Sequence, residues 1–85
     1  MLLVGDNRAM TTNSETLTIH DDMIRLGQAL KLANVVEDGV DARDLITAGE
    51  VLVNGEVETR RGRQLHAGDT ITLTQLEISV VIATA

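Results

Sequence analysis

The sequence predicts an α+β domain in which two short helices pack on a small, mostly antiparallel sheet. Apolar residues recur at helical spacing over residues 23–33 and 40–48. Short alternating or apolar segments follow over residues 51–57, 70–74 and 76–82, which is typical of strands. With 85 residues and no cysteine, the chain forms one domain that is held together by packing rather than by disulfides.

The predicted domain occupies residues 16–85 and follows a flexible N-terminal arm over residues 1–15. The arm is rich in Thr, Asn and charged residues and shows no clear period. Residues 16–19 alternate polar and apolar side chains, so we expect the first short strand there.

The composition excludes several classes of protein. Aromatic residues are absent, so ligands that stack on Phe, Tyr or Trp are excluded and the core consists of aliphatic side chains. No segment approaches the ~18 apolar residues of a membrane span, and the first ten residues lack the basic start of a secretory signal. We therefore expect a cytoplasmic monomer that has no membrane partner, no metal and no cofactor.

Capping signals give the expected helix ends. Asp21 or Asp22 is the expected N-cap of the first helix, because a carboxylate accepts the unpaired amides of the first turn. Asn34 is expected to end that helix, and Gly49 suits the left-handed position that closes the second one. Residues 38–41 resemble a capping box for the second helix. The predicted buried positions on the two helices are Leu26, Ala29, Leu30, Ala33, Ala42, Leu45 and Ile46.

The first hairpin leaves a choice of register. Asn54-Gly55 is a strong signal for a two-residue turn, which pairs Val53 with Glu56. A three-residue loop instead pairs Val53 with Val57 and keeps the valines on one face. We predict the three-residue loop from the hydrophobic pattern. Leu65 is the predicted core anchor after the hairpin.

Charge is unevenly distributed along the chain. The net charge of −6, from 7 basic and 13 acidic residues, taken alone argues against a polyanionic partner. Arg60, Arg61 and Arg63, however, lie within four positions around Gly62. A guanidinium group is well suited to phosphate, and an exposed pair with Glu58 is worth at most ~1 kcal/mol, so we favour phosphate binding there.

Three motifs together resemble the RNA-binding domain of the ribosomal protein S4 family, which is called the αL motif. They are RLGQALKLA at 25–33, ARDLITAGEVLVNG at 42–55 and GDTITL at 68–73. The resemblance covers roughly residues 24–73 and is greatest to the short, stand-alone bacterial members. It implies that structured RNA, such as ribosomal or transfer RNA, is the partner, and it implies contacts from Arg25, Lys31, Arg43, Arg60, Arg61 and Arg63. Acidic residues near the second helix, where many relatives are basic, are a departure from the family pattern.

Two other functions stay open at this point. The acidic surplus, or a free edge on the C-terminal strand, is compatible with a protein-interaction module that binds the ribosome or another protein. Family domains of this type are also often attached to RNA-modifying enzymes. The chain shows no nucleophile with a base, no paired carboxylates at a cleft and no Gly-rich phosphate loop, so we expect no enzymatic activity.

Overall fold

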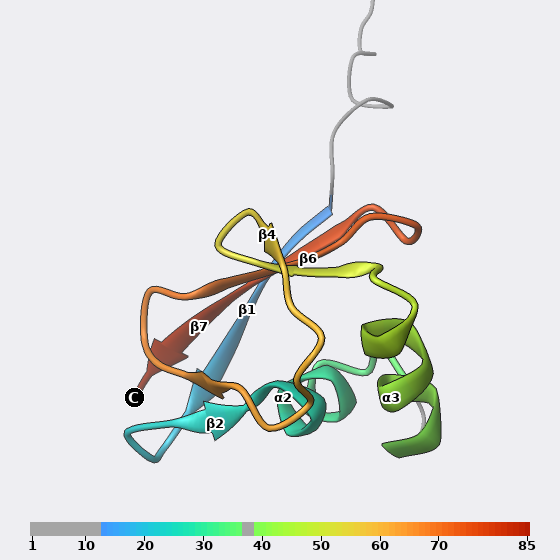
Figure 1. Ribbon diagram of the computed structural model, residues 1–85. Helices are drawn as coiled ribbons and strands as arrows, with labels where there is room; N and C mark the ends of the chain where they lie inside the picture. Colours follow the sequence, from blue (N-terminus) through green and yellow to red (C-terminus); the bar gives the residue numbers. More distant parts are fainter. Residues whose placement is uncertain (1–12, 37–38) are drawn as a thin grey trace, which may run out of the picture.

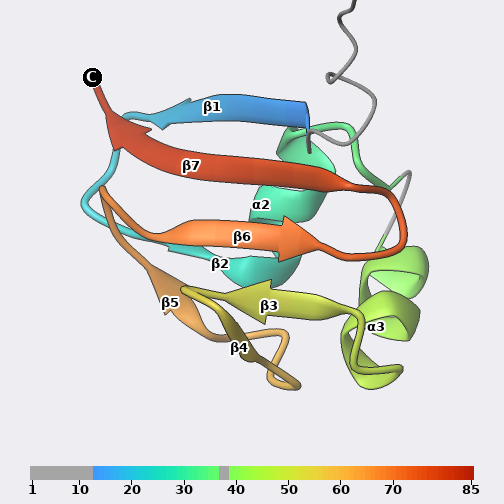
Figure 2. The same ribbon diagram turned by 90° about the horizontal axis from the view of Figure 1, so that it is seen from above.

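The computed structural model describes residues 13–36 and 39–85, and it confirms the predicted α+β class (Figure 1). Two helices lie on one face of the larger sheet, and the two views agree on this arrangement (Figures 1 and 2). The elements are β1 (Asn13–Ile19), β2 (Ile24–Arg25), α2 (Leu26–Leu32), α3 (Gly39–Thr47), β3 (Val51–Val53), β4 (Glu56–Val57), β5 (Gln64–Leu65), β6 (Thr70–Leu73) and β7 (Ile78–Thr84).

The larger sheet has five strands in the order β1-β7-β6-β3-β4. All its pairs are antiparallel except β1–β7, which is parallel from Asn13↔Ile78 to Ile19↔Thr84. The prediction that the C-terminal strand has a free edge is wrong, because β7 pairs on both sides. The edge-strand basis for a protein-interaction module is therefore lost.

The first strand begins earlier in the sequence than predicted, at a position assigned to the N-terminal arm. Strand β1 begins at Asn13, three residues before the predicted start, because β7 is long enough to pair with those residues too. Residues 1–12 of the predicted arm lie outside the described residues, so the arm itself stays a prediction.

The core lies between the helices and the sheet. Leu26, Ala29 and Leu30 of α2 are fully buried, and so are Ala42 and Ile46 of α3, as the helical spacing predicts. Ala33 and Leu45, which were predicted to be buried too, are only partly buried and pack against this core. Leu65 is also fully buried, which confirms it as an anchor. The sheet contributes Ile19, Val51, Val53, Ile71, Leu73, Val80 and Ile82.

The two helices end as predicted, but the first of the two predicted helices begins differently. Asn34, with φ 60°, and Gly49, with φ 79°, occupy left-handed positions and close α2 and α3. The amides of Val35 and Glu50 then bond back to carbonyls in the preceding turns, as in a Schellman motif. The predicted aspartate cap of the first helix is wrong, because the N-cap is Arg25 and it makes no side-chain cap bond. The predicted capping box over 38–41 lies partly outside the described residues.

The predicted three-residue hairpin loop is wrong. The turn has two residues, with Val53 opposite Glu56, and Val57 is 57% exposed. Asn54 and Gly55 have φ values of 53° and 88°, as a type I′ turn requires. The Asn54 side chain also donates to Asp69 Oδ1 at 3.1 Å and accepts the Thr70 amide at 3.0 Å. These contacts from outside the hairpin favour the short turn over burial of Val57.

Candidate nucleic-acid interface

Residues 58–63, which we call the arginine segment, connect β4 to β5 and pass beside the start of α2 (Figure 1). The first two amides of α2 bond to this segment: Leu26 N–H donates to the Arg63 carbonyl at 2.9 Å, and Gly27 N–H donates to the Arg61 carbonyl at 3.0 Å. The first amides of a helix have no partner within it, so the segment performs the capping that the sequence suggested for an aspartate. Helix α2 and the arginine segment are therefore fixed to each other by backbone bonds.

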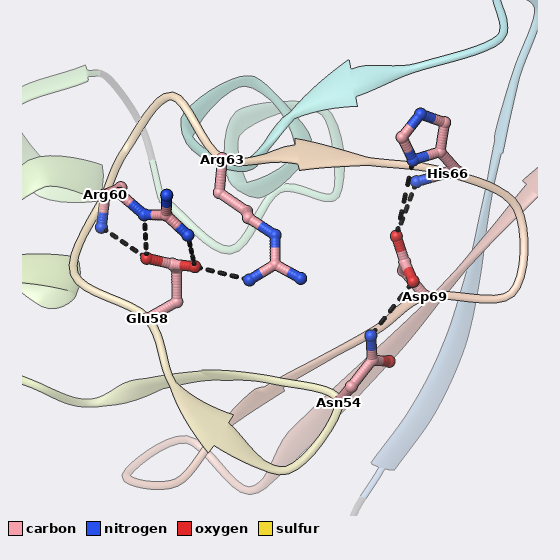
Figure 3. Close-up of polar contacts among 6 residues, drawn as sticks. All are labelled: Asn54, Glu58, Arg60, Arg63, His66 and Asp69. Carbon is pink, nitrogen blue, oxygen red and sulfur yellow. Dashed lines mark hydrogen bonds and ion pairs between the residues drawn. The ribbon is translucent and has the colours of Figure 1, made fainter.

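Glu58 lies at the start of the arginine segment (Figure 3), and it is buried, with 6% of the residue exposed. Its carboxylate accepts three hydrogen bonds from Arg60, through the backbone amide, Nε and Nη2, at 3.0, 3.0 and 3.1 Å. It accepts a fourth from Arg63 Nη1 at 2.6 Å. Hydrogen bonds from the Arg60 side chain, and then from Arg63, lower the pKa of Glu58 from its ordinary value of 4.5 to about 2.

Glu58 differs from the exposed pairing partner that the sequence suggested. It is the one charged side chain found buried among the described residues, and its charge faces two guanidinium groups. One carboxylate leaves the pair of arginines with a net positive charge. Arg60 is also 72% exposed along its side chain, so its outer face is accessible to a ligand.

A hollow lined by three cations lies where the arginine segment meets α2. We call it the cationic hollow; its volume is about 390 Å³, and its lining residues are Arg25, Gly27, Gln28, Lys31, Arg61 and Gly62. Among these described lining residues there is no carboxylate. Arg25 Nη1 makes a long hydrogen bond of 3.4 Å to the Gly62 carbonyl, which ties one wall of the hollow to the other. The hollow therefore offers guanidinium and ammonium donors to an anion.

Gly27 is needed for the Arg61 side chain to cross the helix surface. A Cβ atom at Gly27 would lie 2.5 Å from Arg61 Cγ and 3.0 Å from Arg61 Cδ. Carbon atoms in contact are ordinarily about 3.5–4.0 Å apart, so only glycine admits this placement. Close packing against Arg61 therefore explains why a glycine stands inside this helix.

A second hollow lies along the same segment and is lined by Arg60, Gly62, Arg63, Gln64 and His66. His66 is 59% exposed along its side chain, and its Nδ1 lies 4.0 Å from Asp69 Oδ2. A hydrogen bond from the His66 amide, and then one from the Asn54 side chain, lower the pKa of Asp69 (Figure 3). Asp69 therefore stays ionised and ties the turn beside His66.

The structure brings five of the six predicted contact residues together around the arginine segment. Arg25, Lys31 and Arg61 line the cationic hollow, and Arg60 and Arg63 line the second one. Arg43 is apart from them: it is exposed on α3 and lines neither hollow. Sequence reasoning missed the role of Glu58, although its spacing of two and five residues from Arg60 and Arg63 is a signal that a turn could bring the three together.

The described residues contain neither a helix that could span a membrane nor a side-chain cluster that could hold a metal ion. No helix within residues 13–36 and 39–85 has the length and apolar character of a membrane span. In the same part of the chain, no three His, Asp or Glu side chains gather in a way that could hold a metal ion.

The fold and the site together define a small α+β domain that presents clustered cations beside the start of α2. Comparison with known families agrees with this class. A family model described as the S4 domain matches residues 17–81, and the chain therefore belongs to the S4 domain family.

Relatives cover about two thirds of the chain. The Bacillus subtilis (strain 168) protein named "Probable ribosome maturation protein RlbA" is 46% identical over 57 residues, which are 67% of this chain and 80% of that protein. The Escherichia coli (strain K12) protein named "Putative RNA-binding protein YbcJ" is 36% identical over 58 residues, 68% of this chain and 83% of that protein. A Shigella flexneri protein named "Uncharacterized protein YbcJ" matches to the same extent.

Proposed function

We propose that this protein binds structured RNA without catalysing a reaction on it, and that RNA phosphates occupy the cationic hollow. The observation that carries the proposal is the meeting of Arg25, Lys31 and Arg61 around one hollow of a chain whose net charge is −6. Three cations at one place produce a local positive potential that the overall charge conceals. Arginine–phosphate contacts are charge-assisted and directional, so they suit such a site.

The expected target is RNA recognised by its shape and backbone. The chain has no Phe, Tyr or Trp on which an unpaired base could stack. Phosphate contacts position a protein on folded RNA, and the geometry of the RNA then provides selectivity. The names of the relatives refer to ribosome maturation and to RNA binding, which supports ribosomal RNA as the target and the cytoplasm as the location.

Each candidate contact residue has a distinct role in this proposal. Arg25, Lys31 and Arg61 hold phosphates in the cationic hollow. Arg60 and Arg63 use donors that Glu58 leaves free to hold the RNA backbone at the second hollow. Arg43 makes a separate contact from α3.

Equilibrium binding to a folded ribosomal RNA fragment tests the proposal. Arg61→Ala is expected to weaken binding at least ~10-fold, because a hydrogen bond to a charged group is worth about 1.5–3 kcal/mol. Arg43→Ala is the comparison variant, since it removes the same charge outside the hollow; we expect a loss below ~5-fold, typical of an exposed charge contact.

Three results would contradict different parts of the proposal. A wild-type protein that does not bind folded RNA refutes the function. Equal losses from Arg61→Ala and Arg43→Ala would mean that only total charge matters and that the hollow is not a site. Conversion of the bound RNA to a modified or cleaved product would refute the non-enzymatic role.

A further inference from the structure

Glu58 presents a paradox for a protein that binds a polyanion. A carboxylate beside the arginines lowers the positive potential of the surface, so simple electrostatics predicts that its removal strengthens RNA binding. Burying a charge is also costly unless the charge is fully paired. Glu58 is buried, and four hydrogen bonds to its carboxylate meet this requirement.

From these contacts we infer that Glu58 is a positioning residue, which organises the arginine segment so that the cationic hollow can hold a phosphate. The inference rests on the proposed function, because it assigns the residue a role in that same binding site. Its observable consequence is that loss of the Glu58 charge weakens RNA binding, whereas simple electrostatics predicts stronger binding.

The first step of the argument is that Glu58 closes the arginine segment on itself. Its two carboxylate oxygens join Arg60, two residues along the chain, to Arg63, five residues along. The Arg63 amide donates to the Arg60 carbonyl at 3.2 Å, which makes a turn inside the same loop. Glu58 itself is held to the sheet, because its amide donates to the Val51 carbonyl at 3.0 Å. The carboxylate thus fixes the loop relative to β3.

The second step is that the closed loop places the residues of the cationic hollow. The carbonyls of Arg61 and Arg63 accept the first amides of α2, and the Gly62 carbonyl accepts from Arg25. Arg61 crosses Gly27 at close range, so a small shift of the loop moves its side chain relative to Lys31 on α2. The two arginines that Glu58 bonds line the second hollow and not the cationic hollow, so the effect of Glu58 on the cationic hollow passes through the loop backbone.

The chain provides a matched control for the charge itself. Glu56 lies two residues before Glu58 and is exposed on β4. Its replacement by glutamine removes the same negative charge as Glu58→Gln. Glu56→Gln should therefore show the pure electrostatic effect, which is unchanged or slightly tighter RNA binding. Glu58→Gln should show the opposite.

The test measures affinity and its salt dependence for wild type, Glu56→Gln and Glu58→Gln with one folded RNA. Glu58→Gln is expected to bind about 10-fold more weakly, as for a misplaced charge-assisted contact. The magnitude of the negative slope of log K against log salt should decrease by about 0.7–0.9, which corresponds to one phosphate no longer neutralised. Simple destabilisation would lower the active fraction in a stoichiometric titration, but the slope for the folded molecules would be unchanged.

Amide hydrogen exchange gives a second readout that needs no RNA. The amides of Leu26 and Gly27 bond to the arginine segment, so Glu58→Gln should accelerate their exchange selectively, whereas Glu56→Gln should not. If Glu58→Gln does not fold, Glu58→Asp replaces it: this variant keeps the charge but is too short to bridge both arginines, and its binding should be weaker than that of Glu56→Asp.

The outcomes separate the inference from the proposed function. Weaker binding by Glu58→Gln, with a reduced salt slope, supports the inference. Equal or tighter binding, as for Glu56→Gln, overturns it while leaving RNA binding intact. If wild type fails to bind RNA but the Leu26 and Gly27 amides respond to Glu58→Gln, the proposed function is refuted although the loop organisation is supported.

Discussion

Replacing Gly27 with alanine should stabilise the protein only when the Arg61 side chain is removed. Alanine is favoured over glycine inside a helix by about 0.5–1 kcal/mol. At Gly27 the added methyl would lie 2.5 Å from Arg61 Cγ, so that atom must move by about 1 Å to reach ordinary contact. Because the Arg61 carbonyl is bonded to the Gly27 amide, the backbone of Arg61 cannot simply withdraw.

The two effects have comparable size in the wild-type background. Overpacking costs about 1–3 kcal/mol, so after the helix gain of about 0.5–1 kcal/mol we expect Gly27→Ala to leave the free energy of unfolding unchanged or to lower it by up to ~2.5 kcal/mol. In the Arg61→Ala background the Cγ and Cδ atoms are gone, and the Arg61 carbonyl at 3.7 Å is an ordinary contact. There the same substitution should stabilise by about 0.5–1 kcal/mol. The double-mutant cycle should therefore give a coupling energy of about 1 kcal/mol or more.

Urea unfolding of the four proteins measures this coupling. Gln28→Ala is a suitable control, because Gln28 is exposed at the next position of α2 and should change stability by less than ~0.5 kcal/mol. In RNA binding, Gly27→Ala should lose most of the affinity that Arg61→Ala loses, since it displaces the same side chain. Equal stabilisation by Gly27→Ala in both backgrounds would refute the placement of Arg61 over Gly27.

Three further predictions concern the frame of the site. The folded-state pKa of Glu58, about 2, lies below its ordinary value of 4.5, so its contribution to the free energy of unfolding is complete above pH ~4.5 and is lost as the pH falls towards 2. Between these two pH values the urea midpoint should therefore fall less for Glu58→Gln than for wild type. An equal fall in the two proteins would contradict the buried ion pair. Asn54→Ala should cost ~1–3 kcal/mol, because two side-chain bonds are lost and alanine must adopt φ 53°; Asn54→Gly, which accepts that φ, should cost less in the same urea assay, and equal costs would remove the backbone part of the argument. Leu65→Ala should cost ~2–5 kcal/mol in thermal or urea unfolding, whereas Val57→Ala at the exposed hairpin position should cost under ~0.5 kcal/mol, and similar costs would argue against the observed register.

Local sequence patterns were sufficient to predict the helices and much of the core. The buried faces of both helices follow from apolar spacing, and the left-handed conformations of Asn34 and Gly49 follow from residue type. The burial of Leu65 was also predictable, because it is an isolated apolar residue between polar turns. These features depend on a few neighbouring positions, which is why the sequence reveals them.

The errors arose where distant parts of the chain decide the outcome. The hairpin register depends on bonds from Asn54 to Asp69 and Thr70 of the next turn and strand, and these bonds outweigh the burial of Val57. The interior position of β7 depends on parallel pairing with β1, which no local pattern indicates. Helix α2 begins later than predicted because carbonyls of the arginine segment, and no aspartate side chain, bond to its first amides.

The candidate site was predictable in composition but not in arrangement. Clustering in the sequence indicated Arg60, Arg61 and Arg63, while the family resemblance added Arg25 and Lys31. The structure divides them between two hollows, because Glu58 holds Arg60 and Arg63 while Arg61 turns towards α2. The burial of Glu58 depends on both arginines and on the sheet at once. Residue spacing alone therefore predicts this arrangement only weakly.

The salt dependence of binding to a folded ribosomal RNA fragment tests the central claim most directly, for wild type and for the variant that carries Arg25→Ala, Lys31→Ala and Arg61→Ala together. If these three side chains neutralise phosphates in one hollow, the triple variant should show a shallower salt dependence. The magnitude of the negative slope of log K against log salt should decrease by about 2–3, at 0.7–0.9 for each phosphate contact. Identical slopes for the two proteins would show that RNA phosphates do not occupy the cationic hollow.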